Sequence, residues 1–289
     1  MTMSKGRIGR GLAGLGVLAV TMMVAGAALA AVGHPTDWNL DLQGAGSPIM
    51  ESIRSFHTYL VYLITVIAVF VLALLVVVMV RFNAKANPTP SRTTHNSLLE
   101  IAWTIVPVVI LLAVAFPSFK LLFQETTIPK ADLTVKVTGK QWFWTYTYPD
   151  SGDLEFDSTL ACDDTRTKCD EPRLLAVNNE LVVPVNKVIR LETIAADVIH
   201  SFSVPSFGIK MDAVPGRLNE TWFQATREGM YYGQCSQLCG RDHGYMPIAV
   251  RVVSEDEFNK WLDQAKKKFA AGPDINSYAS NVDSAAQVR

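Results

Sequence analysis

Two long uncharged apolar runs constrain this chain more than any other feature of its sequence. They cover residues 59–80 and 101–119, which is 22 and 19 residues without a charged side chain. A helix needs about 20 consecutive apolar residues to cross the hydrocarbon core of a bilayer. The sequence therefore predicts two transmembrane helices. Pro107 and Pro117 lie in the second run, where neighbouring helices or water can satisfy the carbonyl groups that a bend would free.

The charges beside these runs predict how the chain crosses the membrane. The connection between them carries Arg81, Lys85 and Arg92, and no acidic residue follows before Glu100. Short connections rich in lysine and arginine stay on the cytoplasmic side. We therefore expect the part before the first run, and everything after residue 120, to lie on the periplasmic side of a bacterial-type inner (plasma) membrane.

Residues 1–30 have the features of an export signal. Three basic residues precede an apolar stretch over residues 12–29. Ala28-Leu29-Ala30 then fits the small-x-small pattern of a signal-peptide cleavage site. An uncleaved anchor helix is the alternative, but the many glycine and alanine residues and the polar stretch over 33–43 favour cleavage after Ala30. We therefore leave 1–30 out of the expected fold.

From about residue 131 the chain alternates between apolar and polar residues, as half-buried strands do. Many short strands separated by Gly, Pro and Asn predict a β-sandwich or barrel. The net charge of −1 excludes a protein built around nucleic-acid binding, because such a protein needs a basic surface. The expected strands cover residues 132–138, 141–148, 181–185, 188–193, 201–204, 220–225, 229–232 and 248–253.

A helix is expected after the last strand. Phe258, Trp261 and Ala265 recur on one helical face, and Ser254 followed by Glu257 forms a capping pattern. The chain therefore divides into an export signal (1–30), an extracytoplasmic segment (31–57), a transmembrane helical hairpin (58–122, with its cytoplasmic loop at 81–97), a β-domain (123–254), and a C-terminal helix with a flexible tail (255–289).

The strongest chemical signal lies in GQCSQLCGRDHGYMP, residues 233–247. Two thiols, an imidazole and a thioether fall within twelve residues there, and a second histidine lies upstream. This soft ligand set suits copper, and with two cysteines each sulfur could bridge two metal ions. Zinc is one alternative, although methionine is a poor zinc ligand. A disulfide is another, although it leaves the histidine and the methionine without a role. The residues are His200, Cys235, Cys239, His243 and Met246.

Five stretches of the sequence, taken in order, match one known family. They are HNSLLEIAWTIVP, VKVTGKQWFWTYTYPD, LVVPV, ADVIHSFSVPSFGIKMDAVPGR and YYGQCSQLCGRDHGYMP. Over most of residues 45–265 the chain resembles subunit II of the haem–copper cytochrome c oxidases. The resemblance implies an all-β, cupredoxin-like Greek-key sandwich on a two-helix transmembrane anchor. It also implies a binuclear CuA copper centre.

The resemblance implies six copper ligands. Five are the side chains of His200, Cys235, Cys239, His243 and Met246, and the sixth is the backbone carbonyl of Gln237. The family usually has glutamate at this last position, where the carboxylate also binds a magnesium ion shared with subunit I. An amide oxygen is a neutral and weaker magnesium ligand. The substitution therefore leaves the copper role intact and weakens the expected magnesium site.

Trp142 has two interpretations. Aromatic residues are frequent in strands, and half of those in 141–148 should pack in a core. The resemblance instead makes Trp142 the residue at which electrons enter from cytochrome c, and Asp157 and Asp197 docking positions for that partner. Residues 150–171 carry eight acidic and two basic side chains, which would attract a basic protein or would simply form a solvated surface.

Three further residues complete the expected sites. Glu100 begins the second run, where an acidic residue commonly stabilises a helix N-terminus. The resemblance places it near the mouth of a proton path in subunit I. Cys162 and Cys169 lie in an acidic exported loop without metal-binding neighbours, so we expect a local disulfide between them. This pair is not part of the family pattern.

The sequence therefore predicts the electron-accepting subunit of a proton-pumping cytochrome c oxidase, which passes electrons to haem in subunit I for the reduction of oxygen to water. The expected partners are subunits I and III, cytochrome c and the lipid bilayer, with no nucleic acid. Two other classes stay open. A copper-free subunit II of a quinol oxidase would lack the cysteines, and a membrane-anchored copper carrier would need an exposed, exchangeable site.

Overall fold

The chain folds as a helical unit and a β-rich unit. The computed structural model describes residues 33–161 and 172–269. The predicted export signal, the predicted Cys162–Cys169 disulfide and the tail after residue 269 lie outside the described residues. The helical unit is Glu51–Thr127, and the β-rich unit contains the described residues before and after it.

Two long helices carry the apolar runs. α2 (Pro48–Arg81) contains the first run and α3 (Ser97–Thr126) the second. Each is long and apolar enough to cross a membrane. Most of their apolar side chains are exposed, as they are in a helix that contacts lipid. Pro107 and Pro117 lie inside α3, so the helix continues through both prolines as expected.

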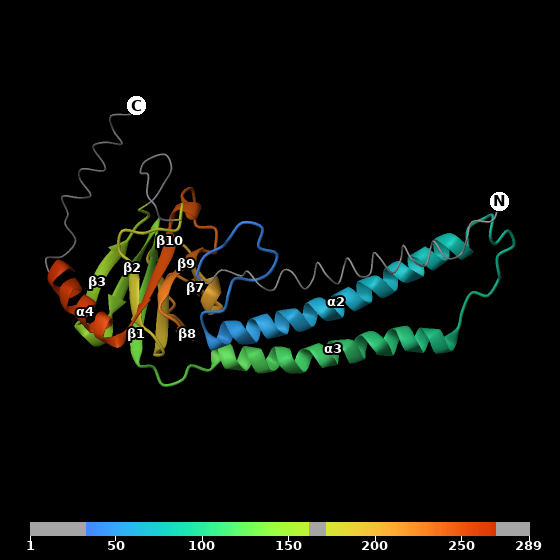
Figure 1. The fold of residues 1–289 in the computed structure, drawn as a ribbon, viewed down its shortest axis with the longest axis horizontal. Coiled ribbons are helices and arrows are strands. Elements are labelled where there is room, and N and C mark those ends of the chain that lie inside the picture. The colour runs from blue at the N-terminus through green and yellow to red at the C-terminus, as the bar shows by residue number, and fades with distance from the viewer. Residues whose placement is uncertain (1–32, 162–171, 270–289) are drawn as a thin grey trace, which may run out of the picture. The chain divides into compact units, whose positions relative to one another are not determined.

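The β-rich unit is a sandwich of two five-stranded sheets (Figure 1). In spatial order, the first consists of β3 (Leu154–Ser158), β2 (Phe143–Tyr148), β1 (Leu133–Lys140), β5 (Val188–Ala195) and β8 (Asn219–Gln224). The second consists of β4 (Leu181–Pro184), β10 (Pro247–Val253), β9 (Gly229–Cys235), β6 (His200–Val204) and β7 (Ile209–Ala213). β1 pairs with β5, and β4 with β10, in parallel. The expected sandwich is confirmed.

The core lies between the sheets and extends under the C-terminal helix. Successive residues of β1 alternate between buried and half-buried, so one face of the strand packs inward. α4 (Glu255–Phe269) buries Phe258 and Ala265 against the sandwich. Its predicted cap is confirmed, because Ser254 Oγ accepts a hydrogen bond from the backbone of Glu257 at 3.3 Å.

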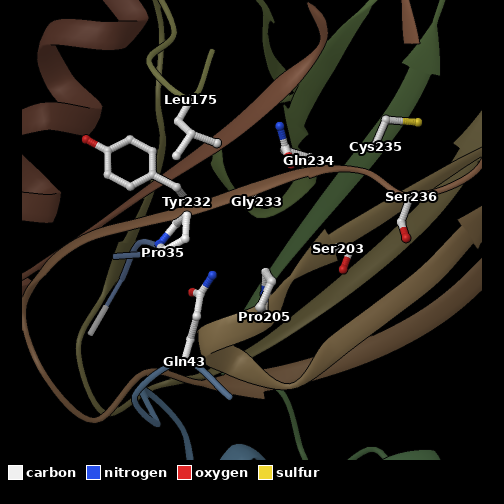
Figure 2. A pocket seen from close by; sticks show the side chains of 10 residues that line it. All are labelled: Pro35, Gln43, Leu175, Ser203, Pro205, Tyr232, Gly233, Gln234, Cys235 and Ser236. Carbon is white, nitrogen blue, oxygen red and sulfur yellow. The ribbon is translucent and has the colours of Figure 1, made fainter. Parts of the chain in front are cut away.

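The segment 33–47 packs on the sandwich before α2 begins. The backbone N–H of Tyr232 donates to Gly33 at 2.7 Å, and that of Gly46 donates to Ser206 at 2.7 Å. A cavity of about 200 Å³ lies between this segment and strands β6 and β9, and Figure 2 shows the residues that line it. The sulfur of Cys235 points away from the other labelled residues in that view.

Candidate metal centre

Strand pairing builds the centre from two distant parts of the chain. His200 begins β6 and Cys235 ends β9, and the antiparallel register places Phe202 opposite Cys235. After β9 the chain forms a loop and a short 3₁₀ helix, η4 (His243–Tyr245), and returns as β10. The β9–β10 register closes the loop, because Gln234 lies opposite Pro247.

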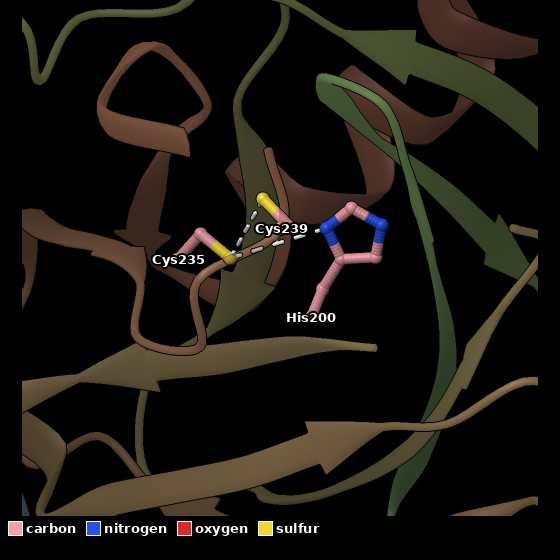
Figure 3. Close-up of side chains that lie close together, drawn as sticks. All are labelled: His200, Cys235 and Cys239. Atoms are coloured by element: carbon pink, nitrogen blue, oxygen red, sulfur yellow. Dashed lines mark hydrogen bonds between the residues drawn. The ribbon is translucent and has the colours of Figure 1, made fainter. Parts of the chain in front are cut away.

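The two thiols lie at the middle of the group. Their Sγ atoms are 3.8 Å apart, and Figure 3 shows them with the imidazole of His200. The Nδ1 atom of His200 is 4.0 Å from Cys235 Sγ, and that of His243 is 3.5 Å from Cys239 Sγ. The structure therefore brings both predicted imidazoles to the predicted thiols, one beside each sulfur.

Two weaker donors complete the group. Met246 Sδ lies 3.5 Å from Cys239 Sγ, and the carbonyl oxygen of Gln237 lies 3.4 Å from Cys235 Sγ. All six residues predicted as copper ligands thus meet in one place. Both thiols, His200 and Met246 are buried. The ligand atoms of His200 and the two cysteines lie within 4.8 Å of one another, as a shared metal ion would require.

The two thiols differ in acidity. Burial by itself raises the pKa of Cys235, but hydrogen bonds from His200 and the surrounding backbone outweigh it and lower this pKa to about 6. Burial, together with the negative charge of Cys235, raises the pKa of Cys239 to about 12. The pair therefore loses one proton easily and keeps the second. A bound cation would take the place of that second proton.

A carboxylate fixes the orientation of His200. Asp197 Oδ1 lies 2.8 Å from His200 Nε2, so the other ring nitrogen faces Cys235. Burial raises the pKa of Asp197, but hydrogen bonds from His200 and two backbone N–H groups outweigh it and lower the pKa. A histidine that binds a metal commonly donates its second N–H to a carboxylate in this way.

Glycine and tryptophan residues shape the space around these ligands. A Cβ atom at Gly139 would lie 2.8 Å from the His200 ring, so only glycine leaves room for that ring. On another side, Trp144 meets His200 edge to face at 5.9 Å between ring centroids. The indole of Trp144 also donates to the carbonyl oxygen of Met246 at 3.2 Å. These contacts hold two ligand residues in place.

The indole of Trp142 contacts the backbone of the loop that carries most of the predicted ligands, residues 235–246, which we call the metal loop. Trp142 is half-buried, and its indole Nε1 donates to the carbonyl oxygen of Cys239 at 3.3 Å. The side-chain amide of Gln141 donates to the same oxygen at 2.8 Å, and its backbone N–H donates to Asp197 at 2.7 Å. Trp144 is fully buried in the core, whereas Trp142 is half-buried and packs against the core from its edge.

The two remaining predicted residues take part in other contacts. Asp157 is one-quarter exposed on β3 and accepts a hydrogen bond from Thr145 Oγ1 at 2.6 Å. Glu100 lies in the first turn of α3, where its carboxylate accepts from the backbone of Asn96 at 3.4 Å. Asn96 in turn accepts from Leu99, which completes a helix cap.

Two family descriptions match the chain over most of its length. "Cytochrome C oxidase subunit II, transmembrane domain" matches residues 35–121, and "Cytochrome C oxidase subunit II, periplasmic domain" matches residues 133–253. The chain belongs to the cytochrome c oxidase subunit II family. This membership confirms the predicted family, and copper is the metal that both the family and the donor set support.

Two relatives match the sequence of this family member over most of their own length. It is 48% identical over 248 residues to the probable cytochrome c oxidase subunit 2 of Rickettsia bellii, covering 86% of this chain and 91% of the relative. It is 43% identical over 269 residues to cytochrome c oxidase subunit 2 of Cereibacter sphaeroides, covering 87% and 88%. A crystal structure of the periplasmic domain of subunit II of cytochrome oxidase from Bradyrhizobium japonicum is 62% identical, covers 50% of this chain and 99% of that one, and has a TM-score of 0.47.

The sequence did not reveal two residues of this subunit II centre, Gly139 and Gln141, and the resemblance assigned Asp197 to docking alone. Gly139 and Gln141 lie in a strand and a turn, where neither residue type signals a metal site. Only the folded chain places them against His200 and Cys239. The role of Asp197 beside His200 had a usable signal, because the carboxylate stands three residues before the histidine.

Proposed function

We propose that this chain is the electron-accepting subunit of a cytochrome c oxidase and that its metal centre holds two copper ions. The observation that carries the proposal is the donor set itself. Two free thiols lie 3.8 Å apart in the described structure, with two imidazoles, a thioether and a backbone carbonyl within 4.0 Å of them. Thiolate and imidazole ligands of this kind suit copper.

The even division of donors favours two copper ions over one. Each sulfur has one imidazole nitrogen and one weak donor within 4.0 Å. A mononuclear blue-copper site uses one cysteine, two histidines and a weak axial ligand, so it would leave one thiol and the carbonyl unused. Two copper ions held by Cys235 and Cys239 would supply a redox centre that exchanges one electron with little change in its bonds.

Trp142 is the proposed point at which electrons arrive from cytochrome c. Its half-buried indole reaches the surface and hydrogen-bonds the peptide of Cys239, so one side chain connects solvent to a ligand residue. Asp157 and Asp197, one-quarter and about one-third exposed, are the proposed docking carboxylates. Acidic groups around the point of arrival would attract a basic partner and orient it.

The proposed orientation puts the copper domain in the periplasm of a bacterium. The connection between α2 and α3 carries Lys85 and Arg92, and Arg81 ends α2, so this connection is cytoplasmic by the charge rule. The β-rich unit and segment 33–47 then lie on the opposite side of the inner membrane. There a soluble cytochrome c can reach Trp142, and subunits I and III of the complex lie in the same membrane.

We also propose roles for Gln237 and Glu100, the first in binding magnesium weakly and the second in proton uptake. The carbonyl of Gln237 serves the copper centre, whereas its exposed side-chain amide replaces the carboxylate that would hold magnesium. Any magnesium shared with subunit I is therefore bound more weakly than by a glutamate. Glu100 is the proposed acid near the proton path of subunit I, in addition to its contact in the cap of α3.

Metal analysis of the purified complex tests the central proposal. We expect two copper ions per chain in this domain, a purple absorption spectrum, and an electron paramagnetic resonance signal from one electron shared by two copper nuclei. Trp142→Gln should leave these spectra unchanged and slow electron transfer from reduced cytochrome c. A surface control such as Lys187→Gln, at a residue that forms an ion pair with Glu255 at 3.2 Å, should leave both unchanged.

Other outcomes distinguish the alternatives. A chain purified without copper, and inactive with cytochrome c, would indicate a structural subunit of a quinol oxidase. A single copper ion that exchanges readily with a chelator would indicate a copper carrier. Either result contradicts the proposed dinuclear centre, whereas normal transfer in Trp142→Gln contradicts only the role of that tryptophan.

A further inference from the structure

Trp142 lies directly against the peptide that follows Cys239. A Cβ atom at Gly240 would come within 2.9 Å of Trp142 Cζ2 and 3.3 Å of its Nε1. Gly240 also has a φ of +126°, in a region where other residues are strained. The indole ring therefore occupies space that any other residue at position 240 would fill, and it hydrogen-bonds the Cys239 carbonyl from there.

Arg241 covers this indole with a cation. Its Cζ lies 5.6 Å from the ring of Trp142, which is within the range of cation–π attraction. Asp242 fixes the guanidinium through two contacts, Nη2 to Oδ2 at 3.0 Å and Nε to Oδ1 at 3.3 Å. Two parallel contacts of this type restrict the plane of the guanidinium. Because the Arg241 side chain is 82% exposed, these contacts rather than core packing determine its place.

A docking role does not account for Arg241. The proposed partner is basic, and a second cation, Lys140, already lies over the neighbouring ring of Phe143 at 5.3 Å. Like charges across an interface weaken association, so a residue selected for docking alone would be neutral or acidic here. A cation is what an electron-rich aromatic face attracts, so the geometry favours a role toward Trp142 within the chain.

We propose that Arg241 is a positioning residue that holds the indole of Trp142 on the Cys239–Gly240 peptide, and that Asp242 aligns Arg241 for this task. The proposal rests on the proposed role of Trp142 in electron arrival. Electron transfer slows steeply as donor and acceptor separate, so a ring that leaves the Cys239 carbonyl passes electrons more slowly. Docking of cytochrome c does not need Arg241 and is not weakened when the cation is removed.

Arg241→Gln in the complete oxidase complex tests this proposal, with Arg241→Lys as the conservative variant. The matched control is Lys210→Gln, which removes an exposed cation from β7. Lys210 lies opposite Ser203, whereas Ala213 at the other end of β7 lies opposite His200. We would measure first-order electron transfer from saturating reduced cytochrome c, and KM at several ionic strengths. Reduction by hexaammineruthenium(II), which need not use Trp142, and the copper absorption spectrum would be measured in parallel.

We expect Arg241→Gln to slow first-order transfer about two- to fivefold, the range that corresponds to a cation above an exposed ring. KM should stay the same or fall, and the spectrum and the reduction by ruthenium should not change. Arg241→Lys should keep most of the rate, because the cation remains. Asp242→Asn should lie between wild type and Arg241→Gln.

Three results in the Arg241 variants would overturn the proposal. An unchanged first-order rate in Arg241→Gln would show that the cation does not hold the ring. An effect on KM alone, varying with ionic strength, would make Arg241 a docking residue. A loss in Arg241→Lys equal to that in Arg241→Gln would exclude the cation–π contact. Trp142→Gln, measured alongside, separates the proposal for Trp142 from the proposal for Arg241. Normal transfer in Trp142→Gln would overturn both proposals together.

Discussion

Replacing Gly139 by alanine should damage the metal centre without touching a ligand. The new Cβ would lie 2.8 Å from Cδ2 of His200, against an ordinary contact of at least 3.4 Å, so the atoms must separate by 3.4 − 2.8 = 0.6 Å. The ring has little freedom to move. His200 is fully buried, its Nε2 contacts Asp197 at 2.8 Å, and Trp144 packs against it.

The expected cost is the difference between two opposing effects. Overpacking a filled site costs about 1–3 kcal/mol, whereas replacing glycine by alanine stabilises by about 0.4–1 kcal/mol through the unfolded chain. Gly139→Ala should therefore destabilise the β-rich unit by about 1–2 kcal/mol. Displacing His200 should lower copper affinity about 10- to 100-fold, as changes to residues that orient a ligand do.

Chelator competition and thermal denaturation of the full chain in detergent would measure these effects. Gly244→Ala is the matched control, because a Cβ atom there would meet nothing within 4 Å although Gly244 follows His243 directly. Wild-type copper affinity in Gly139→Ala, together with an unchanged thermal midpoint, would refute the reasoning. A loss in both variants would mean that the centre is sensitive to any side chain added near it, whether or not that side chain contacts His200.

Three further predictions follow from single contacts. Asp197→Asn keeps the shape but not the charge beside His200 and should lower copper affinity about tenfold in a chelator competition; unchanged affinity would leave Asp197 with a surface role only. Tyr148→Phe removes a buried hydroxyl that donates to the Val182 carbonyl at 2.8 Å and accepts from its N–H at 3.0 Å. It should cost about 1–3 kcal/mol in thermal denaturation, and a neutral result would mean that the backbone finds other partners. Ser254→Ala removes the cap of α4 and should cost about 1 kcal/mol, whereas Ser254→Asp should restore stability if the cap is the cause.

Features that are local in sequence were predictable. The two membrane helices follow from runs whose length is set by the thickness of a bilayer. Strands β3 and β7 were missed because each carries outward-facing charged residues, which are uncommon in strands. Both are edge strands in the folded sandwich, where charges discourage pairing with another chain. Their position at the sheet edges explains why their composition is typical of loops.

The sequence by itself determined the chemistry of the centre, and the tertiary structure decided its geometry. The segment from Cys235 to Met246 carries five of the six donors within one loop, so their proximity needs little more than a turn. His200 reaches them only through the register of β6 and β9. Trp142 meets the Cys239 carbonyl across a sequence separation of 97 residues. Such contacts depend on how whole strands pair and pack, which no local pattern of residues records.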